Sequence, residues 1–158
     1  MTGPTGQELV MPPWMAFALF VIIFPAFWVA ILRIVASVGW SQIAAAYPAM
    51  SDPPSSARRV RWGSMTIGRG VMAANYGSNI TGWLSDTGLW LRPSLSFRLF
   101  HPMIYIPWAR AQSIEEVRVF LFKRVRVTLA GDVPELRFMG RLGRAVLEHR
   151  REGRGTRR

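Results

Sequence analysis

The feature that most constrains this chain is an apolar run, from Val10 to Leu32, that contains no charged residue. An α-helix rises about 1.5 Å per residue, so roughly 20 apolar residues cross a hydrocarbon core about 30 Å thick. The preceding residues contain no Lys or Arg, unlike the basic start of a signal peptide. A soluble core would need to cover bulky side chains on every face of the helix. The sequence therefore predicts one transmembrane helix, over residues 10–38, with a kink at Pro25.

Aromatic and basic side chains near this run are predicted to anchor the helix at the two faces of the membrane. Trp and Tyr gather at membrane–water interfaces, and a long Arg side chain can extend from the hydrocarbon core to the headgroups. The predicted anchor residues are Trp14, Trp28, Arg33, Trp40 and Tyr47.

The charge of the chain is unevenly distributed, and this predicts its orientation. The formal net charge is +11, and residues 1–32 contain a single charged residue, Glu8, so residues 33–158 carry +12. Arg and Lys that flank a transmembrane helix stay on the cytoplasmic side. We therefore expect a protein of the bacterial inner membrane with its N-terminus outside and its C-terminal domain in the cytoplasm. The absence of cysteine agrees with a reducing compartment.

A short connecting segment is predicted between the membrane helix and the basic domain. Ser41 is placed to cap a helix that runs to Tyr47 along the membrane interface, and Pro48 ends it. The following residues are rich in Pro and Ser and indicate a linker. The predicted organisation is a tail outside (1–9), the transmembrane helix (10–38), the interfacial helix and linker (39–57), a basic β domain with a C-terminal helix (58–152) and a disordered basic tail (153–158).

Strand-like patterns dominate the basic domain. Ile80–Leu84 and Leu89–Leu91 read as a hairpin whose turn spans residues 85–88, with Gly88 as the left-handed residue. Between residues 117 and 129 the apolar residues of one parity are Val117, Val119, Leu121, Val125, Val127 and Leu129. Lys123-Arg124 either turns the chain or lies within one long bent strand, and two strands are favoured. Shorter runs complete a sheet of six or seven strands; they are Val60–Ile67, Met103–Ile106 and Leu136–Met139.

The C-terminal segment changes to helical spacing. Leu142, Ala145, Val146 and His149 fall on one face of a helix, and Arg141 and Arg144 fall on others. The predicted fold is therefore a mainly β domain, a barrel of the pleckstrin-homology-like type with six or seven antiparallel strands and a C-terminal amphipathic helix, behind one N-terminal transmembrane helix.

Short motifs across the middle of the chain carry a resemblance to a known group of proteins. These motifs are Gly39-Trp40, Ile43-Ala44, Tyr47-Pro48, Gly88-Leu89-Trp90-Leu91, His101-Pro102 and Ile106-Pro107-Trp108. With them the chain resembles a group of small, uncharacterised bacterial single-pass membrane proteins with a pleckstrin-homology-like cytoplasmic domain. The resemblance implies a membrane-tethered domain and attaches no reaction to it.

The sequence predicts no enzyme, metal site or cofactor. The chain has no cysteine, and its two histidines, His101 and His149, have no second ligand at the short spacings that build metal sites. Glu115 and Glu116 are adjacent on a predicted strand and so face opposite sides, which does not make a carboxylate pair.

The basic surface is the predicted functional feature. All but Lys123 of the 20 cationic residues are arginine. The predicted contacts with an anionic surface are Arg58, Arg59 and Arg61, after the linker, and Arg118, Arg124 and Arg126, on the polar parity of residues 117–129. An arginine near an anionic leaflet gains about 1 kcal/mol.

Three functions follow from these features. The first hypothesis is a non-enzymatic, membrane-anchored module whose domain docks on anionic lipid or on a membrane partner. The second is an accessory subunit that binds other integral membrane proteins in a larger inner-membrane complex, because seven Trp and nine Phe offer more aromatic surface than an anchor requires. The third is nucleic-acid binding, which the absence of a recognised motif makes the weakest.

Overall fold

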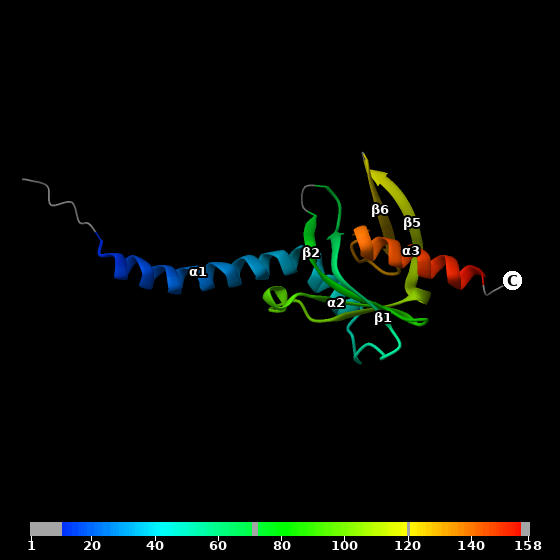
Figure 1. The fold of residues 1–158 in the computed structure, drawn as a ribbon, viewed down its shortest axis with the longest axis horizontal. Helices are drawn as coiled ribbons and strands as arrows, with labels where there is room; N and C mark the ends of the chain where they lie inside the picture. The colour runs from blue at the N-terminus through cyan, green and yellow to red at the C-terminus, as the bar shows by residue number, and fades with distance from the viewer. Residues whose placement is uncertain (1–10, 71–72, 120, 156–158) are drawn as a thin grey trace, which may run out of the picture. The chain divides into compact units, whose positions relative to one another are not determined.

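The computed structural model describes residues 11–70, 73–119 and 121–155, which divide into two compact units. The predicted outside tail, residues 1–9, and the final residues 156–158 lie beyond this description. The first unit ends at Ile31 and contains most of helix α1, Pro13–Val35, with Pro25 inside it (Figure 1). Within the described ranges, α1 belongs to the one helix that is long and apolar enough to cross a membrane. Large apolar side chains of this helix are exposed, including Trp14, Phe17 and Ile22.

The second unit begins at Leu32 with the end of α1, which continues through a wide turn, η1 (Ala36–Trp40), into α2 (Ser41–Ala46). Gly39 has a φ of 151°, which permits the bend between the two helices, and a Cβ there would lie 2.5 Å from the Ile67 side chain. The predicted cap at Ser41 is wrong, because Ser41 has helical backbone angles and no side chain caps α2. Because η1 runs directly into α2, the backbone before α2 is already helical and no side-chain cap is needed.

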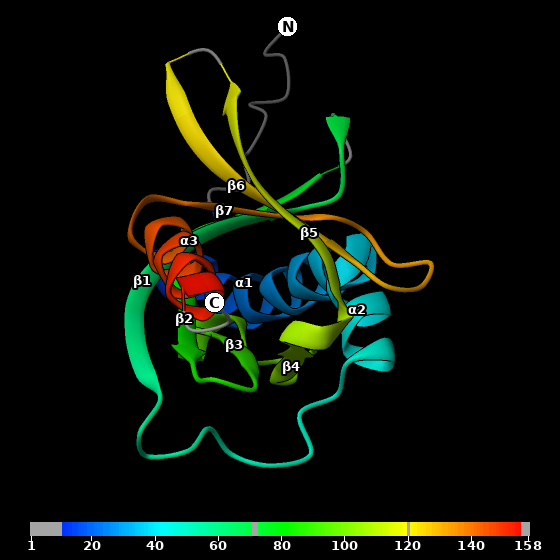
Figure 2. The ribbon, with the colours of Figure 1, turned by 90° about the vertical axis from the view of Figure 1, so that its right-hand side faces the viewer.

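Within the described residues, seven antiparallel strands form one curled sheet (Figures 1 and 2). The strands are β1 (Arg58–Ile67), β2 (Ala74–Leu84), β3 (Gly88–Pro93), β4 (Ile104–Pro107), β5 (Ala111–Val119), β6 (Phe122–Leu129) and β7 (Leu136–Met139). Their order is β4-β3-β2-β1-β7-β6-β5, so the first and last strands pair with each other. Two 3-10 turns, η3 (Leu95–Phe97) and η4 (Trp108–Arg110), flank β4. The predicted antiparallel sheet and its C-terminal helix are confirmed.

Helix α3 (Gly140–Gly155) packs its apolar side chains into the core of this sheet. Leu142, Ala145 and Val146 are fully buried, as their spacing predicted. Leu142 lies directly over Gly63 and Gly82, where an added Cβ would come within 2.9 Å of its side chain. The helix reaches Gly155 and so includes the first residues of the predicted tail.

The hairpin between β2 and β3 shows why a glycine stands at position 88. Gly88 begins β3 and is not among the residues with positive φ, so its predicted left-handed role is wrong. An added Cβ would instead lie 2.6 Å from the carbonyl oxygen of Ile106 and against the ring of Tyr105, which packs onto this position. The glycine provides space for the neighbouring strand β4.

Gly88→Ala is expected to destabilise the domain by about 1–3 kcal/mol, because the extra methyl group overpacks a site bounded by backbone. Gly77→Ala is the matched control in the same sheet, since nothing lies within 4 Å of its added Cβ. Chemical unfolding of the detergent-solubilised chain, followed by near-UV circular dichroism, measures both. Equal stability of the two variants would contradict the packing role of Gly88.

The register of β5 and β6 changes the predicted faces of this hairpin. Arg118 pairs with Lys123, Val117 with Arg124 and Glu115 with Arg126. Paired residues share a face, so Arg118 lies on the face opposite Arg124 and Arg126, and the three do not form one cationic face as predicted. The reason is that the strands end at Val119 and resume at Phe122, so Lys123-Arg124 lies within β6 and not in the turn.

Candidate functional site

The strongest candidate site is a basic groove between the first half of β1 and helix α3. Along β1, the residues that pair with β7 are Ser64–Ile67, so on that side the earlier part of β1 has α3 beside it in place of a strand. The hollow between them measures about 600 Å³. Its charged lining, which we call the basic groove, consists of Arg58, Arg59, Arg61, Arg141, Arg144 and Glu148.

Two of the five arginines in the basic groove are engaged by neighbours. Arg58 donates to Glu148 across the groove at 2.9 Å, and both side chains are largely exposed. The guanidinium of Arg59 lies over the ring of Trp83, 5.2 Å from its centre. Within the described part of the chain, the side chains of Arg61, Arg141 and Arg144 make no hydrogen bond or ion pair. The groove therefore holds three uncommitted guanidinium groups.

Trp62 completes the rim of the basic groove in an unusual conformation. It is 66% exposed and has a φ of 58°, which is uncommon for a bulky residue. The register between β1 and β2 shifts here, from the pair Val60–Gly82 to the pair Gly63–Ile80, so β1 carries a bulge. Such bulges redirect side chains and occur often beside functional sites. The bulge holds the indole of Trp62 in the solvent beside the arginines.

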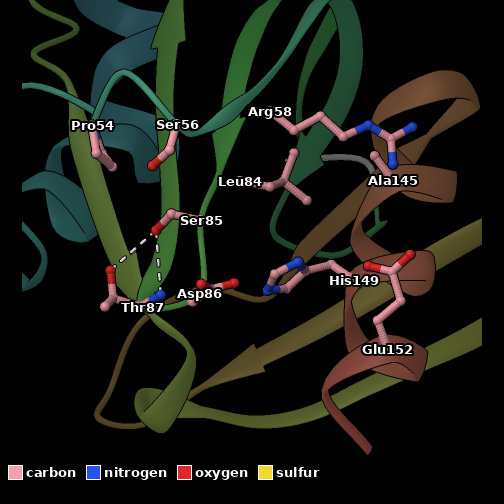
Figure 3. Close-up of a pocket in the computed structure, with 10 residues that line it drawn as sticks. All are labelled: Pro54, Ser56, Arg58, Leu84, Ser85, Asp86, Thr87, Ala145, His149 and Glu152. Carbon is pink, nitrogen blue, oxygen red and sulfur yellow. Dashed lines mark hydrogen bonds between the residues drawn. The ribbon is translucent and has the colours of Figure 1, made fainter. Parts of the chain in front are cut away.

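A second hollow, of about 390 Å³, adjoins the basic groove and shares Arg58 with it (Figure 3). Asp86 and His149 face this hollow from opposite walls. The hydroxyl of Ser85 bonds to Thr87 at 3.1 Å, within its own turn, and the ring of His149 stacks on Trp108 at 5.1 Å. These contacts do not place the Ser85 or Thr87 hydroxyl against a side chain that could act as its general base. Among the described residues, no three His, Cys, Asp or Glu side chains form a group that could hold a metal ion.

A separate cluster surrounds the buried carboxylate of Glu135, just before β7. Its side chain is 4% exposed and accepts from Arg69 Nε at 2.8 Å and from Arg137 Nε at 2.6 Å, and Arg126 Nε lies 4.0 Å away. Burial alone would raise the pKa of Glu135, but the hydrogen bonds and charges of Arg69 and Arg137 outweigh it and lower that pKa. The cluster explains Arg126 as part of a structural site.

A second buried polar group, His101, lies next to the end of α1. Its Nδ1 lies 3.0 Å from the carbonyl oxygen of Leu99, which can only accept, so Nδ1 donates and Nε2 accepts from the Tyr76 hydroxyl at 3.0 Å. Burial lowers the pKa of His101 and raises that of Tyr76. Trp40 packs on both rings. The group is a satisfied part of the core.

The structure separates the predicted membrane anchors into two groups. Trp14 and Arg33 are exposed, and Trp28 is half-buried. Trp40 and Tyr47 are buried in the β domain, so their predicted place in the membrane interface is wrong. Trp40 Nε1 donates to the Pro102 carbonyl at 3.0 Å, and the Tyr47 hydroxyl donates to Ala130. Their polar atoms are satisfied by backbone inside the domain and not by lipid headgroups.

The predicted cationic residues are also divided. Arg58, Arg59 and Arg61 come together in the basic groove, where they meet Arg141 and Arg144, which the sequence did not connect with them. Arg118 and Arg124 lie apart from them on the β5–β6 hairpin, on its two faces. The distance in sequence between β1 and α3 is the reason that no local pattern joins the two halves of the groove.

Sequence reasoning also missed an exposed apolar loop between β3 and β4. Leu95, Leu99 and Phe100 are exposed, and Phe100 has a φ of 65°. The guanidinium of Arg33, at the end of α1, lies 5.5 Å from the centre of the Phe100 ring. We call Leu95–Phe100 the apolar loop. Its sequence, LSFRLF, carries four large apolar residues in six positions, which was the available signal.

Comparison of the chain with protein-family models, with curated proteins and with solved structures finds no match.

Proposed function

We propose that this chain is a non-enzymatic module of the bacterial inner membrane, anchored by α1, whose cytoplasmic domain docks on the anionic membrane surface beside its own anchor. A helix with exposed apolar side chains such as Trp14, Phe17 and Ile22 requires an apolar surrounding. A lipid bilayer supplies it, and the uncharged run is long enough to span one. The excess of arginine after α1 supports an orientation with the N-terminus outside.

The observation that carries the docking proposal is the contact of Arg33 with Phe100. Arg33 is the first charged residue after the apolar run, so it marks the level of the headgroups when α1 spans the bilayer. Phe100 packs against it, which brings the exposed side chains of the apolar loop to the same level. Phe100 also has a positive φ, a costly conformation for a bulky residue, and such conformations cluster at binding and switch regions.

The energies involved support docking by a tethered domain. Burying an exposed Leu or Phe side chain gains about 1.5–3 kcal/mol, so partial burial of Leu95 and Leu99 contributes a few kcal/mol. The anchor raises the local concentration of the membrane surface, and a weak contact is then well occupied.

The strand order supports a pleckstrin-homology-like identity for the domain. The barrel expected from the sequence has six or seven antiparallel strands and a C-terminal amphipathic helix. The described residues supply seven such strands, with β1 paired to β7 and α3 packed into the sheet, which supports that identity. Domains of this layout occur on many proteins with different functions, so the function is argued from the surfaces.

Orientation is tested with single cysteines, because the chain has none of its own. A membrane-impermeant maleimide applied to spheroplasts is expected to label Thr5→Cys and not Asp132→Cys, which is exposed and lies outside the apolar loop. Labelling of Asp132→Cys alone would show the opposite orientation, and labelling of both in intact spheroplasts would show that α1 does not span.

Docking is tested by hydrogen exchange of the full chain in nanodiscs. Amides of the apolar loop are expected to exchange more slowly in discs with anionic phosphatidylglycerol than in discs of phosphatidylcholine alone. Leu99→Asp is expected to remove this protection. Leu121→Asp, an equally drastic change at an exposed leucine of the β5–β6 hairpin, is the control and leaves the loop protected. Identical exchange in the two lipids would disprove docking.

A second function, an accessory subunit of a larger inner-membrane complex, is favoured by the end of the β5–β6 hairpin. Leu121 is 96% exposed and Phe122 is also exposed, and Figure 2 shows the hairpin extending beyond the rest of the sheet. Exposed apolar residues at such an end typically contact a partner. Co-migration with other membrane proteins in mild detergent, lost in Leu121→Asp, is the expected result. A single species of 17.8 kDa protein mass would contradict it.

A further inference from the structure

We propose that the basic groove is a binding site for a phosphate ester, held by Arg61, Arg141 and Arg144 beside the indole of Trp62. This inference goes beyond membrane docking, because the site would bind a soluble phosphate ester as well as a lipid headgroup that bears one. It rests on four observations: the free guanidinium groups, the charge balance of the groove, the conformation of Trp62 and the size of the hollow.

The uncommitted arginines have the chemistry that phosphate requires. A guanidinium presents a planar fork of donors that matches two phosphate oxygens, and it stays charged at any physiological pH. Arg61 extends from β1, and Arg141 and Arg144 lie one turn apart on α3, so both walls of the hollow contribute. A ligand with several negative oxygens accepts from both walls at once.

The charge balance of the groove points to an anion from outside the chain. Five arginines line the hollow with one carboxylate, Glu148, which Arg58 already engages. Like charges that are close together repel one another, and a bound anion lowers that repulsion beyond what water and salt do. The cluster around Glu135 shows how this fold satisfies such a set internally, because there Arg69, Arg126 and Arg137 surround a buried carboxylate. The basic groove has the same number of free arginines and no such carboxylate.

Trp62 and the size of the hollow define the class of ligand. The hollow of about 600 Å³ falls in the range of small-molecule sites and exceeds the volume of one phosphate group. The exposed indole at its rim offers an apolar face to the organic group that carries the phosphate. A left-handed conformation at a bulky residue is retained where the position of the side chain matters. We therefore assign a phosphate ester in preference to inorganic phosphate as the natural ligand.

The first experiment titrates the full chain, in a neutral detergent, with inorganic pyrophosphate as the probe and follows the heat of binding. Saturable binding at one site is expected. Arg141→Ala/Arg144→Ala is expected to weaken it at least tenfold, because each charge-assisted contact contributes roughly tenfold in affinity. Arg141→Lys/Arg144→Lys keeps the charge without the fork, and an intermediate loss is expected.

The matched control is Arg110→Ala/Arg118→Ala, which removes two exposed arginines outside the groove and outside the apolar loop, and the same charge. Its affinity for pyrophosphate is expected to stay within twofold of the unaltered chain. Equal losses in the control and in Arg141→Ala/Arg144→Ala would mean attraction to the total charge, as in non-specific binding to nucleic acid, and would overturn the site. The site would also be overturned if the unaltered chain showed neither saturable binding of pyrophosphate nor protection by phosphatidic acid in the nanodisc experiment described next.

The second experiment distinguishes a lipid source from a soluble one. Hydrogen exchange of residues 58–63 and 140–148 is compared in nanodiscs that contain phosphatidic acid, a phosphate monoester, or the same proportion of phosphatidylglycerol. Protection specific to phosphatidic acid, lost in Arg141→Ala/Arg144→Ala, assigns the site to a headgroup. Pyrophosphate binding without that protection assigns it to a soluble ester. Docking of the domain is measured separately, by hydrogen exchange of the apolar loop. If docking fails, the test of the basic groove is still valid.

Discussion

Trp40→Ala is expected to destabilise the β domain by about 3–5 kcal/mol, the range found for large aromatic residues removed from a core. Trp40 is 0% exposed, and its ring packs against Tyr76 and His101 at 5.4 and 5.5 Å. Truncation leaves a cavity, and it also leaves the Pro102 carbonyl without its donor. Chemical unfolding of the detergent-solubilised chain, followed by near-UV circular dichroism, measures the loss.

Trp14→Ala is the matched control for this prediction. Trp14 is 70% exposed on α1, in the other compact unit, so its removal is expected to leave the unfolding of the β domain unchanged. If Trp40 were a membrane-interface residue, as the sequence predicted, the two variants would have similar unfolding curves. Similar curves would therefore contradict the buried position of Trp40.

The wrong prediction for Trp40 and Tyr47 has a physical cause. Both side chains combine an apolar body with one polar atom, and this suits a membrane interface and the margin of a core equally well. The deciding contacts come from residues distant in the sequence, Pro102 for Trp40 and Ala130 for Tyr47. A local pattern contains no information about such partners, whereas it does contain the helical spacing that correctly predicted the buried face of α3.

Strand positions were predictable because alternation and turn residues are local signals. The β2–β3 hairpin lies where Ser85–Gly88 predicted it, and β7 has the predicted bounds. The faces of β5 and β6 were not predictable, because a shift of the turn by a few residues changes which side chains share a face. Arg118 was therefore grouped with Arg124 and Arg126 by parity, although it pairs with Lys123 on the other face.

The half of the basic groove that β1 contributes could be predicted from the sequence, and the half that α3 contributes could not. Arg58, Arg59 and Arg61 stand together in the sequence and were assigned to an anionic contact. Their partners on α3 become neighbours only because β7 is short and leaves the first half of β1 open to the helix. The positive φ of Trp62 depends on the bulge in β1, and no residue pattern in this segment predicts a bulge.

Glu135→Gln is expected to cost about 3–5 kcal/mol, because it removes the only carboxylate that the described cluster places between three arginines. The geometry of the side chain is kept, and the negative charge that compensates Arg69, Arg126 and Arg137 is lost. Glu115→Gln is the control. Glu115 is exposed and faces Arg126 in the register of β5 and β6, and its removal is expected to cost less than about 1 kcal/mol.

The same carboxylate predicts how stability depends on pH. The pKa of Glu135 is lower in the folded domain than its usual value of 4.5, so its contribution is complete above that value and is lost as the pH falls towards the folded pKa. Unfolding measured from pH 7 to pH 3 is expected to show a steeper acid loss in the unaltered chain than in Glu135→Gln. Parallel profiles would mean that Glu135 is not ionised between its arginines. Because the charge of Glu135 holds Arg137 of β7 and Arg126 of β6 together, its protonation weakens the pairing that closes the sheet against β1.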